Sequence, residues 1–262
     1  LAHALDGKRF DTIRELGLFD FMDEMVKKGK IRYPGFSFHD EFDVFKRIVD
    51  SYDWKVAQVQ MNLLDEFHQA TMEGVRYAAN KGIRIVVMEP VRGGSLVKTV
   101  PNEIRELYES AVPGRSAAEW AFRWLIDKPE FMTILSGMSD LAQADDNLRI
   151  FDSAEAGCLS KVEKETLEKV RKAYEARIRV GCTGCEYCMP CPQGIQIPKI
   201  FRSYDTASMF DDFADFRRRY NAMEVHADAC IGCESCVAAC PQHFKTPIPE
   251  MLKQIHEENI DR

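Results

Sequence analysis

The chain has 262 residues, of which 45% are hydrophobic, so it can bury one sizeable core and carry a small appendage. Its formal charge of −7 and its pI near 5.5 argue against the basic face that a nucleic-acid-binding protein needs. No apolar run approaches the roughly 20 residues that span a bilayer. We therefore predict neither a nucleic-acid partner nor a membrane partner.

Short apolar segments alternate with amphipathic segments over the first half of the chain. The predicted strands lie at residues 1–5, 31–37, 56–64, 84–90 and 131–136. The predicted helices lie at residues 10–29, from residue 42, at 66–81, within 101–127 and at 141–151. Five strand–helix units with strands of the buried type predict a parallel α/β architecture.

An open doubly wound sheet and a closed barrel both fit this alternation. A complete eight-unit barrel takes about 250 residues, so five units occupy about the length seen here. The chain begins at Leu1, without an initiator methionine, inside a predicted strand. We therefore predict a partial (β/α)8 barrel over residues 1–152, with three further units upstream. Residues 153–180 are predicted to form a charged connecting helix, and residues 181–262 a small, mostly helical domain.

Eight of the nine cysteines lie in two runs, CTGCEYCMPCP from Cys182 and CIGCESCVAACP from Cys230. The second run has the spacing C-x2-C-x2-C-x3-C-P that two-cluster bacterial ferredoxins use, and the first is one residue tighter before its last cysteine. In that arrangement three thiolates come from one run and the fourth comes from the other. One predicted cluster is bound by Cys182, Cys185, Cys188 and Cys240. The other is bound by Cys230, Cys233, Cys236 and Cys191.

Two other interpretations of these cysteines stay open. Two four-thiolate zinc sites would use the same eight residues, although zinc ribbons place their cysteines in pairs. Disulfides are the least favoured, because nothing in the sequence indicates secretion. Free cysteines at this density indicate a reducing cytoplasm. Cys158 lies outside both runs and is predicted to be a packing residue.

Five segments, in chain order, resemble strands four to eight of an aldo-keto reductase: LAHAL, GKIRYPGFSFHD, VAQVQMNLLD, GIRIVVMEPVRGGSL and SGMSDLAQADDNL. The resemblance covers residues 1–152, and the cysteine-rich tail resembles that of a subgroup with a C-terminal ferredoxin-type extension. It implies a β/α barrel that interconverts a small carbonyl and alcohol with a nicotinamide cofactor, NAD or NADP, at the C-terminal mouth of the barrel.

The resemblance also implies roles for individual residues. His3 would orient the substrate carbonyl, and Ser37 and Gln58 would hold the nicotinamide carboxamide. Met88 takes the place of an aromatic ring that stacks on the nicotinamide, where a soft thioether can still pack. The remaining implied residues lie near the pyrophosphate or the adenosine half: Gly94, Gly137, Gln143 and Asn147. Taken alone, each of these residue types is more often structural, and His39 and His68 are predicted to be structural.

Two features differ from the family pattern. Members selective for NADP place a lysine after strand eight and an arginine a turn later, where this sequence has the uncharged Gly137 and Gln143. No strong preference for the phosphorylated cofactor is therefore predicted. The catalytic tyrosine, lysine and aspartate of the family belong to its first three strands, which this sequence does not contain.

The leading hypothesis is an oxidoreductase barrel joined to a two-cluster electron-transfer domain. A hydride carries two electrons whereas each cluster carries one, so direct coupling requires a flavin or a substrate radical, and no flavin motif is visible. The clusters could instead be structural, or could serve a partner ferredoxin. The alternative hypothesis is a non-catalytic electron-transfer or scaffold protein whose barrel is a docking platform.

Overall fold

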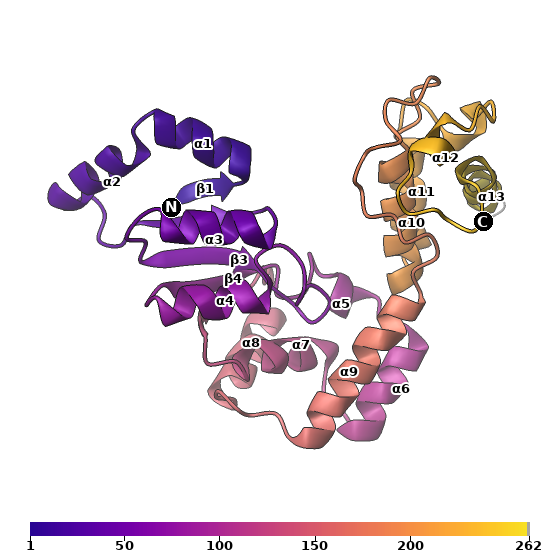
Figure 1. Ribbon diagram of the computed structural model, residues 1–262. Helices are drawn as coiled ribbons and strands as arrows, with labels where there is room; N and C mark the ends of the chain where they lie inside the picture. The colour runs from indigo at the N-terminus through magenta and orange to yellow at the C-terminus, as the bar shows by residue number, and fades with distance from the viewer. Residues whose placement is uncertain (261–262) are drawn as a thin grey trace. The chain divides into compact units, whose positions relative to one another are not determined.

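The structure is a computed structural model that describes residues 1–260. Figure 1 shows the chain, which divides into two compact units. The first unit comprises Leu1–Lys98 and Arg105–Arg171, and the second comprises Thr99–Ile104 and the chain from Lys172 onward. None of the helices in residues 1–260 combines the length and the apolar character that a bilayer span requires.

A five-stranded parallel sheet forms the centre of the first unit. Its strands are β1 (Ala2–Leu5), β2 (Gly35–Phe38), β3 (Val56–Gln60), β4 (Arg84–Met88) and β5 (Phe131–Ile134). Their order in space follows their order in the chain, and every neighbouring pair is parallel. The parallel α/β architecture is thus confirmed. The sheet is not closed into a barrel, because β1 and β5 form its two edges.

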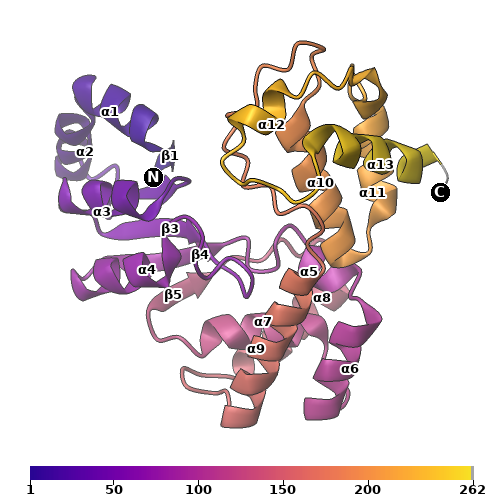
Figure 2. The same cartoon turned by 45° about the vertical axis from the view of Figure 1, so that its right-hand side comes forward.

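Helices follow the strands of the first unit, and Figures 1 and 2 show α3 and α4 running beside β3 and β4. The helices of this part of the chain are α1 (Gly7–Glu15), α2 (Leu18–Lys27), α3 (Phe42–Asp50), α4 (Thr71–Asn80), α5 (Ser95–Lys98), α6 (Asn102–Ala111), α7 (Ala117–Ile126), α8 (Leu141–Asp152) and α9 (Lys161–Ala176). Side-chain caps begin several of them: Asp6 accepts a hydrogen bond from the Arg9 amide at 2.7 Å, and Asp140 accepts one from the Gln143 amide at 2.8 Å.

Some predicted element boundaries are wrong. The single helix predicted at 10–29 is two helices, because Gly17 adopts a left-handed conformation (φ 88°) that separates α1 from α2. The strand predicted from residue 31 begins only at Gly35, and the helix predicted at 66–81 begins only at Thr71. The short helix α5 was not predicted.

One face of the sheet is covered by helices and the other is more open. Phe36 and Phe38 of β2 both contact Phe45 of α3, with ring centroids 5.9 and 5.0 Å apart. Their register partners on β3 are Ala57 and Val59, which are fully buried. Val59 therefore faces the helices.

The opposite, more open face carries the alternate residues. Ser37 pairs in register with Gln58, Gln58 with Val86, and Val86 with Thr133. Gln58, Val86 and Met88 are half-buried, and Thr133 is exposed. This face holds three of the residues implied in cofactor binding, and their geometry is described below.

The second unit is mostly helical, as predicted. It contains α10 (Ile197–Phe210), α11 (Phe213–Asn221), the 3-10 helix η1 (Ala227–Ala229), α12 (Ser235–Ala239) and α13 (Ile248–Ile260). Its core is built from buried side chains such as Ile200, Phe201, Phe216, Tyr220 and Leu252, and partly buried cysteines of both runs pack against this core. The cysteine loops are thus attached directly to a small hydrophobic core.

Lys128, between α7 and β5, is a half-buried cation in the first unit. Its Nζ donates to the Trp124 carbonyl at 2.8 Å and lies 3.4 Å from the centroid of the Trp124 ring. Burial lowers the pKa of Lys128 to about 8, although carboxylates including those of Glu66 and Asp127 oppose the shift. Below pH 8 the folded protein therefore carries the cost of burying the charge, and this cost is relieved as the pH rises from 8 towards the unfolded pKa of about 10.4.

We predict that Lys128→Met removes this pH dependence. Between pH 8 and 10.4 the wild-type free energy of unfolding should rise relative to that of the variant by at most about 1.4 kcal/mol per pH unit, because the unfolded state binds one more proton. Urea unfolding followed by tryptophan fluorescence measures the difference. Lys161→Met, which removes a lysine whose side chain is 90% exposed, is the control and should follow the wild type. Equal slopes for wild type and Lys128→Met would contradict the prediction.

The open sheet also predicts how the first part of the chain behaves alone. The edge strands leave backbone groups unpaired, and apolar side chains near β5 such as Met132 and Met138 are about half exposed. We therefore expect residues 1–152 expressed alone to be insoluble, or molten and dye-binding. Residues 178–262 with iron and sulfide should fold alone, since metal cross-links stabilise a small core. Cooperative thermal unfolding of a soluble, monomeric 1–152 fragment would be inconsistent with this view.

Candidate functional site

A cavity of about 780 Å³ lies beyond the carboxyl ends of β4 and β5. Parallel strands place their carboxyl ends along one edge of a sheet, and ligands commonly bind at that edge. Four residues that the sequence implied in cofactor binding line this cavity: Gly94, Gly137, Gln143 and Asn147. Its volume lies within the range of about 300–1,000 Å³ that small-molecule and cofactor sites occupy.

The walls of this cavity are held by backbone geometry and side-chain amides. Gly93 and Gly94 both adopt positive φ values, 61° and 92°, so the chain turns sharply after β4. On the other wall, Gln143 accepts a hydrogen bond from the Ser139 amide at 2.9 Å, and Asn147 donates to the Ser136 hydroxyl at 2.8 Å. Gln143 and Asn147 therefore brace the loop after β5 as well as lining the space.

Lys98, the last residue of α5, also lines the cavity and was not predicted as a site residue. The sequence signal was a lysine four residues after Gly94 in the loop that follows a buried strand. Lys98 therefore supplies a positive charge to this cavity, although Gly137 and Gln143 are uncharged. Apolar contacts come from side chains such as Phe122 and Leu135.

Ser37, Gln58 and Met88 lie on the open face of the sheet, on three adjacent strands. The Ser37 hydroxyl accepts a hydrogen bond from the Ala4 amide at 2.7 Å, and Gln58 Nε2 lies 3.3 Å from the Met88 sulfur. The three side chains are therefore brought onto neighbouring strands. They are not among the residues that line the 780 Å³ cavity.

His3 occupies a different place. It is exposed on β1 and lines a separate hollow of about 920 Å³ together with residues such as Arg9 and Asp40. This hollow shares no lining residue with the cavity at Gly94. The structure thus does not bring His3 together with the four residues of that cavity. His39 and His68 are both exposed and line neither hollow.

A buried polar network, also missed from the sequence, fixes the loop after β3. Asp65 accepts hydrogen bonds from Gln60 Nε2 at 2.8 Å and from Asn62 Nδ2 at 2.7 Å, and Asn62 donates to the Glu89 carbonyl at 3.1 Å. Asn62 is fully buried and Asp65 is 6% exposed. The network ties the end of β3 to the end of β4.

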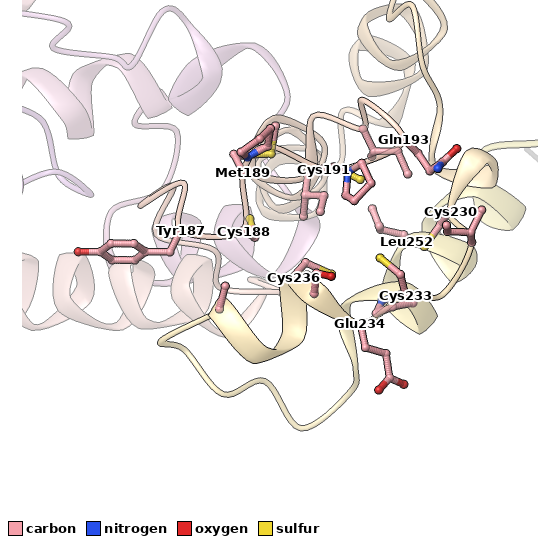
Figure 3. A pocket seen from close by; sticks show the side chains of 18 residues that line it. Tyr187, Cys188, Met189, Cys191, Gln193, Cys230, Cys233, Glu234, Cys236 and Leu252 are labelled. Carbon is pink, nitrogen blue, oxygen red and sulfur yellow. The ribbon is translucent and has the colours of Figure 1, made fainter.

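A hollow of about 230 Å³ in the second unit is lined by five cysteines (Figure 3). They are Cys188, Cys191, Cys230, Cys233 and Cys236. Four of them are the complete ligand set predicted for one cluster, three from the second run and Cys191 from the first. Figure 3 shows Tyr187 and Glu234 directed away from the hollow. The residues around this space therefore fit an iron–sulfur cluster by their donor chemistry.

The surroundings of the other cysteines agree with the second predicted set. Burial raises the pKa of Cys182, and the nearby Cys185 and Cys240 raise it further. Burial likewise raises the pKa of Cys188 to about 11, with additional contributions from Cys182, Cys236 and Cys240. Cys240 of the second run thus lies near Cys182 and Cys188 of the first, which supports the exchange of fourth ligands between the runs.

Within residues 1–260, no three His, Cys, Asp or Glu side chains lie close enough to hold a single metal ion. A cubane does not need such convergence, because each thiolate binds a different iron atom. Cys158 belongs to the first unit, where its half-buried thiol lies 3.8 Å from the Arg123 carbonyl. Its position agrees with the predicted packing role.

Asp205 of α10 holds the chain that leads into the first cysteine run. Its carboxylate is 7% exposed and accepts hydrogen bonds from three consecutive backbone amides, those of Arg179 at 3.0 Å, Val180 at 2.8 Å and Gly181 at 2.9 Å. Three amide donors satisfy a buried carboxylate well. The residue directly before Cys182 is therefore fixed to α10.

Comparison with known families identifies two regions of the chain. Residues 10–172 match the aldo/keto reductase family. The chain belongs to this family. Residues 181–244 match the 4Fe-4S dicluster domain, so this aldo/keto reductase family member also carries a ferredoxin-type iron–sulfur domain. The family and the ferredoxin-type extension inferred from the sequence are confirmed, and the assignment of the five strands to strands four to eight stays a prediction.

Similar solved structures include an aldo-keto reductase from Bacillus halodurans, in its holo and apo forms. Each is 21% identical to this family member, with a TM-score of 0.48. The matches cover 58% of this chain and 54% of the holo or 55% of the apo chain. The chain thus spans about half the length of these relatives. A search of curated proteins finds no match.

Pairs of cysteine substitutions test the exchanged ligand sets. If the fourth ligands are exchanged, Cys182→Ala with Cys240→Ala damages one cluster, and the protein should keep about four of eight irons. Cys236→Ala with Cys240→Ala damages both clusters and should leave few. Iron and inorganic-sulfide analysis of the anaerobically reconstituted protein measures this, with Cys158→Ala as the control that keeps all iron. The reverse pattern of iron loss would mean that each run binds its own cluster.

Proposed function

We propose that this protein is an iron–sulfur oxidoreductase that couples nicotinamide-linked carbonyl or alcohol chemistry in the first unit to two 4Fe-4S clusters in the second. The cavity beyond β4 and β5 supports the nicotinamide part of this proposal, because Gly94 of the loop after β4, Gly137 of the loop after β5, and Gln143 and Asn147 of α8 all line it. The hollow lined by cysteines of both runs supports the iron–sulfur part of this proposal.

The cavity supports binding of a nicotinamide dinucleotide in an extended form. Gly93 and Gly94, which lack side chains, allow the backbone to approach a diphosphate, and Lys98 offsets its negative charge. Gln143 and Asn147 lie on the opposite wall, where they would contact the adenosine half. All of these residues lie at the edge of the sheet where parallel strands end.

The open face of the sheet supports placement of the nicotinamide. Gln58 presents a half-buried amide that suits a carboxamide, which both donates and accepts hydrogen bonds, and the buried Ser37 hydroxyl lies beside it on the adjacent strand. Met88 supplies a polarizable sulfur beside Gln58 for contact with the ring. When bound, the nicotinamide cofactor supplies or accepts a hydride at a carbonyl or alcohol carbon.

His3 is proposed to orient the carbonyl oxygen by hydrogen bonding. The proton that a carbonyl oxygen receives on reduction is assigned, through the family resemblance, to a tyrosine that this sequence does not supply. The substrate is therefore proposed only as a small carbonyl or alcohol.

The clusters would exchange one electron each, so they cannot take a hydride directly. We propose that electrons pass between the clusters and a ferredoxin-type partner, or through a flavin that bridges two-electron and one-electron steps. Thiolates of both cysteine runs hold the clusters, and the hydrophobic core behind the runs keeps part of their surface from water.

Cofactor titration of the reconstituted full chain tests the nicotinamide half of this proposal. Lys98→Gln should weaken binding of NADH and of NADPH alike by about tenfold, or about 1.4 kcal/mol, because the diphosphate is common to both. Quenching or enhancement of the nicotinamide fluorescence under anaerobic conditions gives the dissociation constants.

Lys161→Gln, which removes an exposed lysine of the same unit, is the control and should bind like the wild type. A wild-type preference of roughly a hundredfold for NADPH, about 2.7 kcal/mol, would show that cations from elsewhere bind the 2′-phosphate. A loss of affinity in Lys98→Gln that is confined to NADPH would contradict the assignment of Lys98 to the diphosphate. If the protein takes up its full iron but binds no nicotinamide, the alternative function, that of an electron-transfer or scaffold protein, would be favoured over the proposed enzyme.

A further inference from the structure

The two cysteine runs have the same local backbone conformation. Each contains the pattern C-x-G-C-E-x-C, and the glycine and glutamate of both runs adopt positive φ values. The angles are 74° at Gly184 and 64° at Glu186 in the first run, and 68° at Gly232 and 59° at Glu234 in the second. The backbone and the nearby glutamates are thus equivalent, and they do not distinguish one cluster site from the other.

The side chain above the glycine differs between the runs. At Gly184 the Arg202 side chain occupies the space that a Cβ atom would point into, with its Cδ and Nη1 atoms both 3.0 Å from that position. At Gly232 no atom lies within 4 Å of the corresponding position. The first run therefore has a guanidinium against its loop, between Cys182 and Cys185, and the second run has none there.

The charge of Arg202 is not neutralised by a salt bridge. Arg177, Arg179, Arg218 and Arg219 of the same unit each lie within 4.0 Å of at least one carboxylate. Arg202 has no carboxylate partner in the part of the chain that the structure describes. Its side chain is exposed on α10 and lies against the loop at Gly184, so water screens its charge but no carboxylate among residues 1–260 neutralises it.

Carboxylates near the two runs do not cancel this difference. Asp205 of α10 accepts hydrogen bonds from three backbone amides of the residues that lead into the first run. Asp228 lies two residues before Cys230, and its carboxylate is 3.8 Å from His256 Nε2. One carboxylate therefore lies beside each run, whereas in the described chain Arg202 has no counterpart above the glycine of the second run.

We propose that Arg202 makes the two clusters inequivalent by raising the reduction potential of the one bound through Cys182, Cys185, Cys188 and Cys240. The inference rests on the proposed two clusters. Reduction adds one negative charge to a cluster, and a nearby unpaired cation stabilises that charge. The first-run cluster is then the one that holds the first electron, and electrons pass from the second-run cluster to it.

The proposal is tested by reductive titration of the reconstituted full chain, followed by electron paramagnetic resonance. The wild type should show two separate one-electron steps. Arg202→Gln should lower the equilibrium constant of the easier step about tenfold, a shift of about 59 mV, and leave the harder step in place. Arg202→Lys should keep most of the wild-type value, because it keeps the charge.

Arg217→Gln is the matched control. It removes the same charge from α11, and Arg217 likewise has no carboxylate partner among residues 1–260. It should shift neither step. The site is assigned in the Cys182→Ala, Cys240→Ala background, which retains only the second-run cluster, and there Arg202→Gln should have no effect.

Unchanged potentials in Arg202→Gln, a shift confined to the harder step, or an equal shift in Arg217→Gln would each overturn the proposal. If Arg202→Gln loads less iron than the wild type, the same titration of Arg202→Met decides, since methionine keeps an aliphatic stem. Wild-type protein that retains no iron or sulfide would instead refute the proposed clusters. Iron and sulfide analysis before the titration therefore separates absence of the clusters from absence of an effect of Arg202 on their potentials.

Discussion

The parallel register of the five strands is the constraint on which the first unit depends. It places every carboxyl end at one edge, so the loops that follow β3, β4 and β5 become neighbours although they are far apart in the sequence. The network around Asp65 then fixes one of these loops, and the positive φ values at Gly93 and Gly94 fix the next. Because the same alternation places Phe36 and Phe38 against α3, Ser37 and Gln58 lie on the opposite, more open face of the sheet.

In the second unit, metal binding by the cysteine runs would stabilise the fold, as a larger hydrophobic core does in larger domains. A domain of this size buries little apolar surface, so cross-links through metal clusters contribute much of its folding free energy. If the fourth ligands are exchanged, each cluster joins two distant chain segments. The hydrophobic core already brings these segments together, since cysteines of both runs pack against it. Packing and metal binding then stabilise the same arrangement.

Much of this organisation could be predicted from the sequence because it depends on periodicity and on cysteine spacing. Apolar runs identified all five strands, and residue order identified the family. The break at Gly17 was missed because the apolar residues on its two sides continue one helical pattern, and a left-handed glycine is visible only in the backbone. Lys98 was missed because its position at the cavity, across from the loop after β5, depends on how α5 packs. Such a tertiary relation is not visible in the sequence. The face on which Val59 lies could not be predicted, because the alternation in VAQVQ does not reveal which of its two faces meets the helices.

The three amide hydrogen bonds to Asp205 bear on the thermodynamics of cluster binding. Asp205 belongs to α10, whose residues form the hydrophobic core, so these bonds form with that core and use no iron ligand. Residues 179–181 are consequently ordered wherever the core is packed. Fixing the backbone of a residue opposes folding by about 1–2 kcal/mol, so ordering three residues on metal binding would weaken it by about 3–6 kcal/mol. For a cluster bound by the first run, Asp205 would transfer that entropy loss from the metal-binding step to the packing of the core, and the affinity for the cluster would be higher.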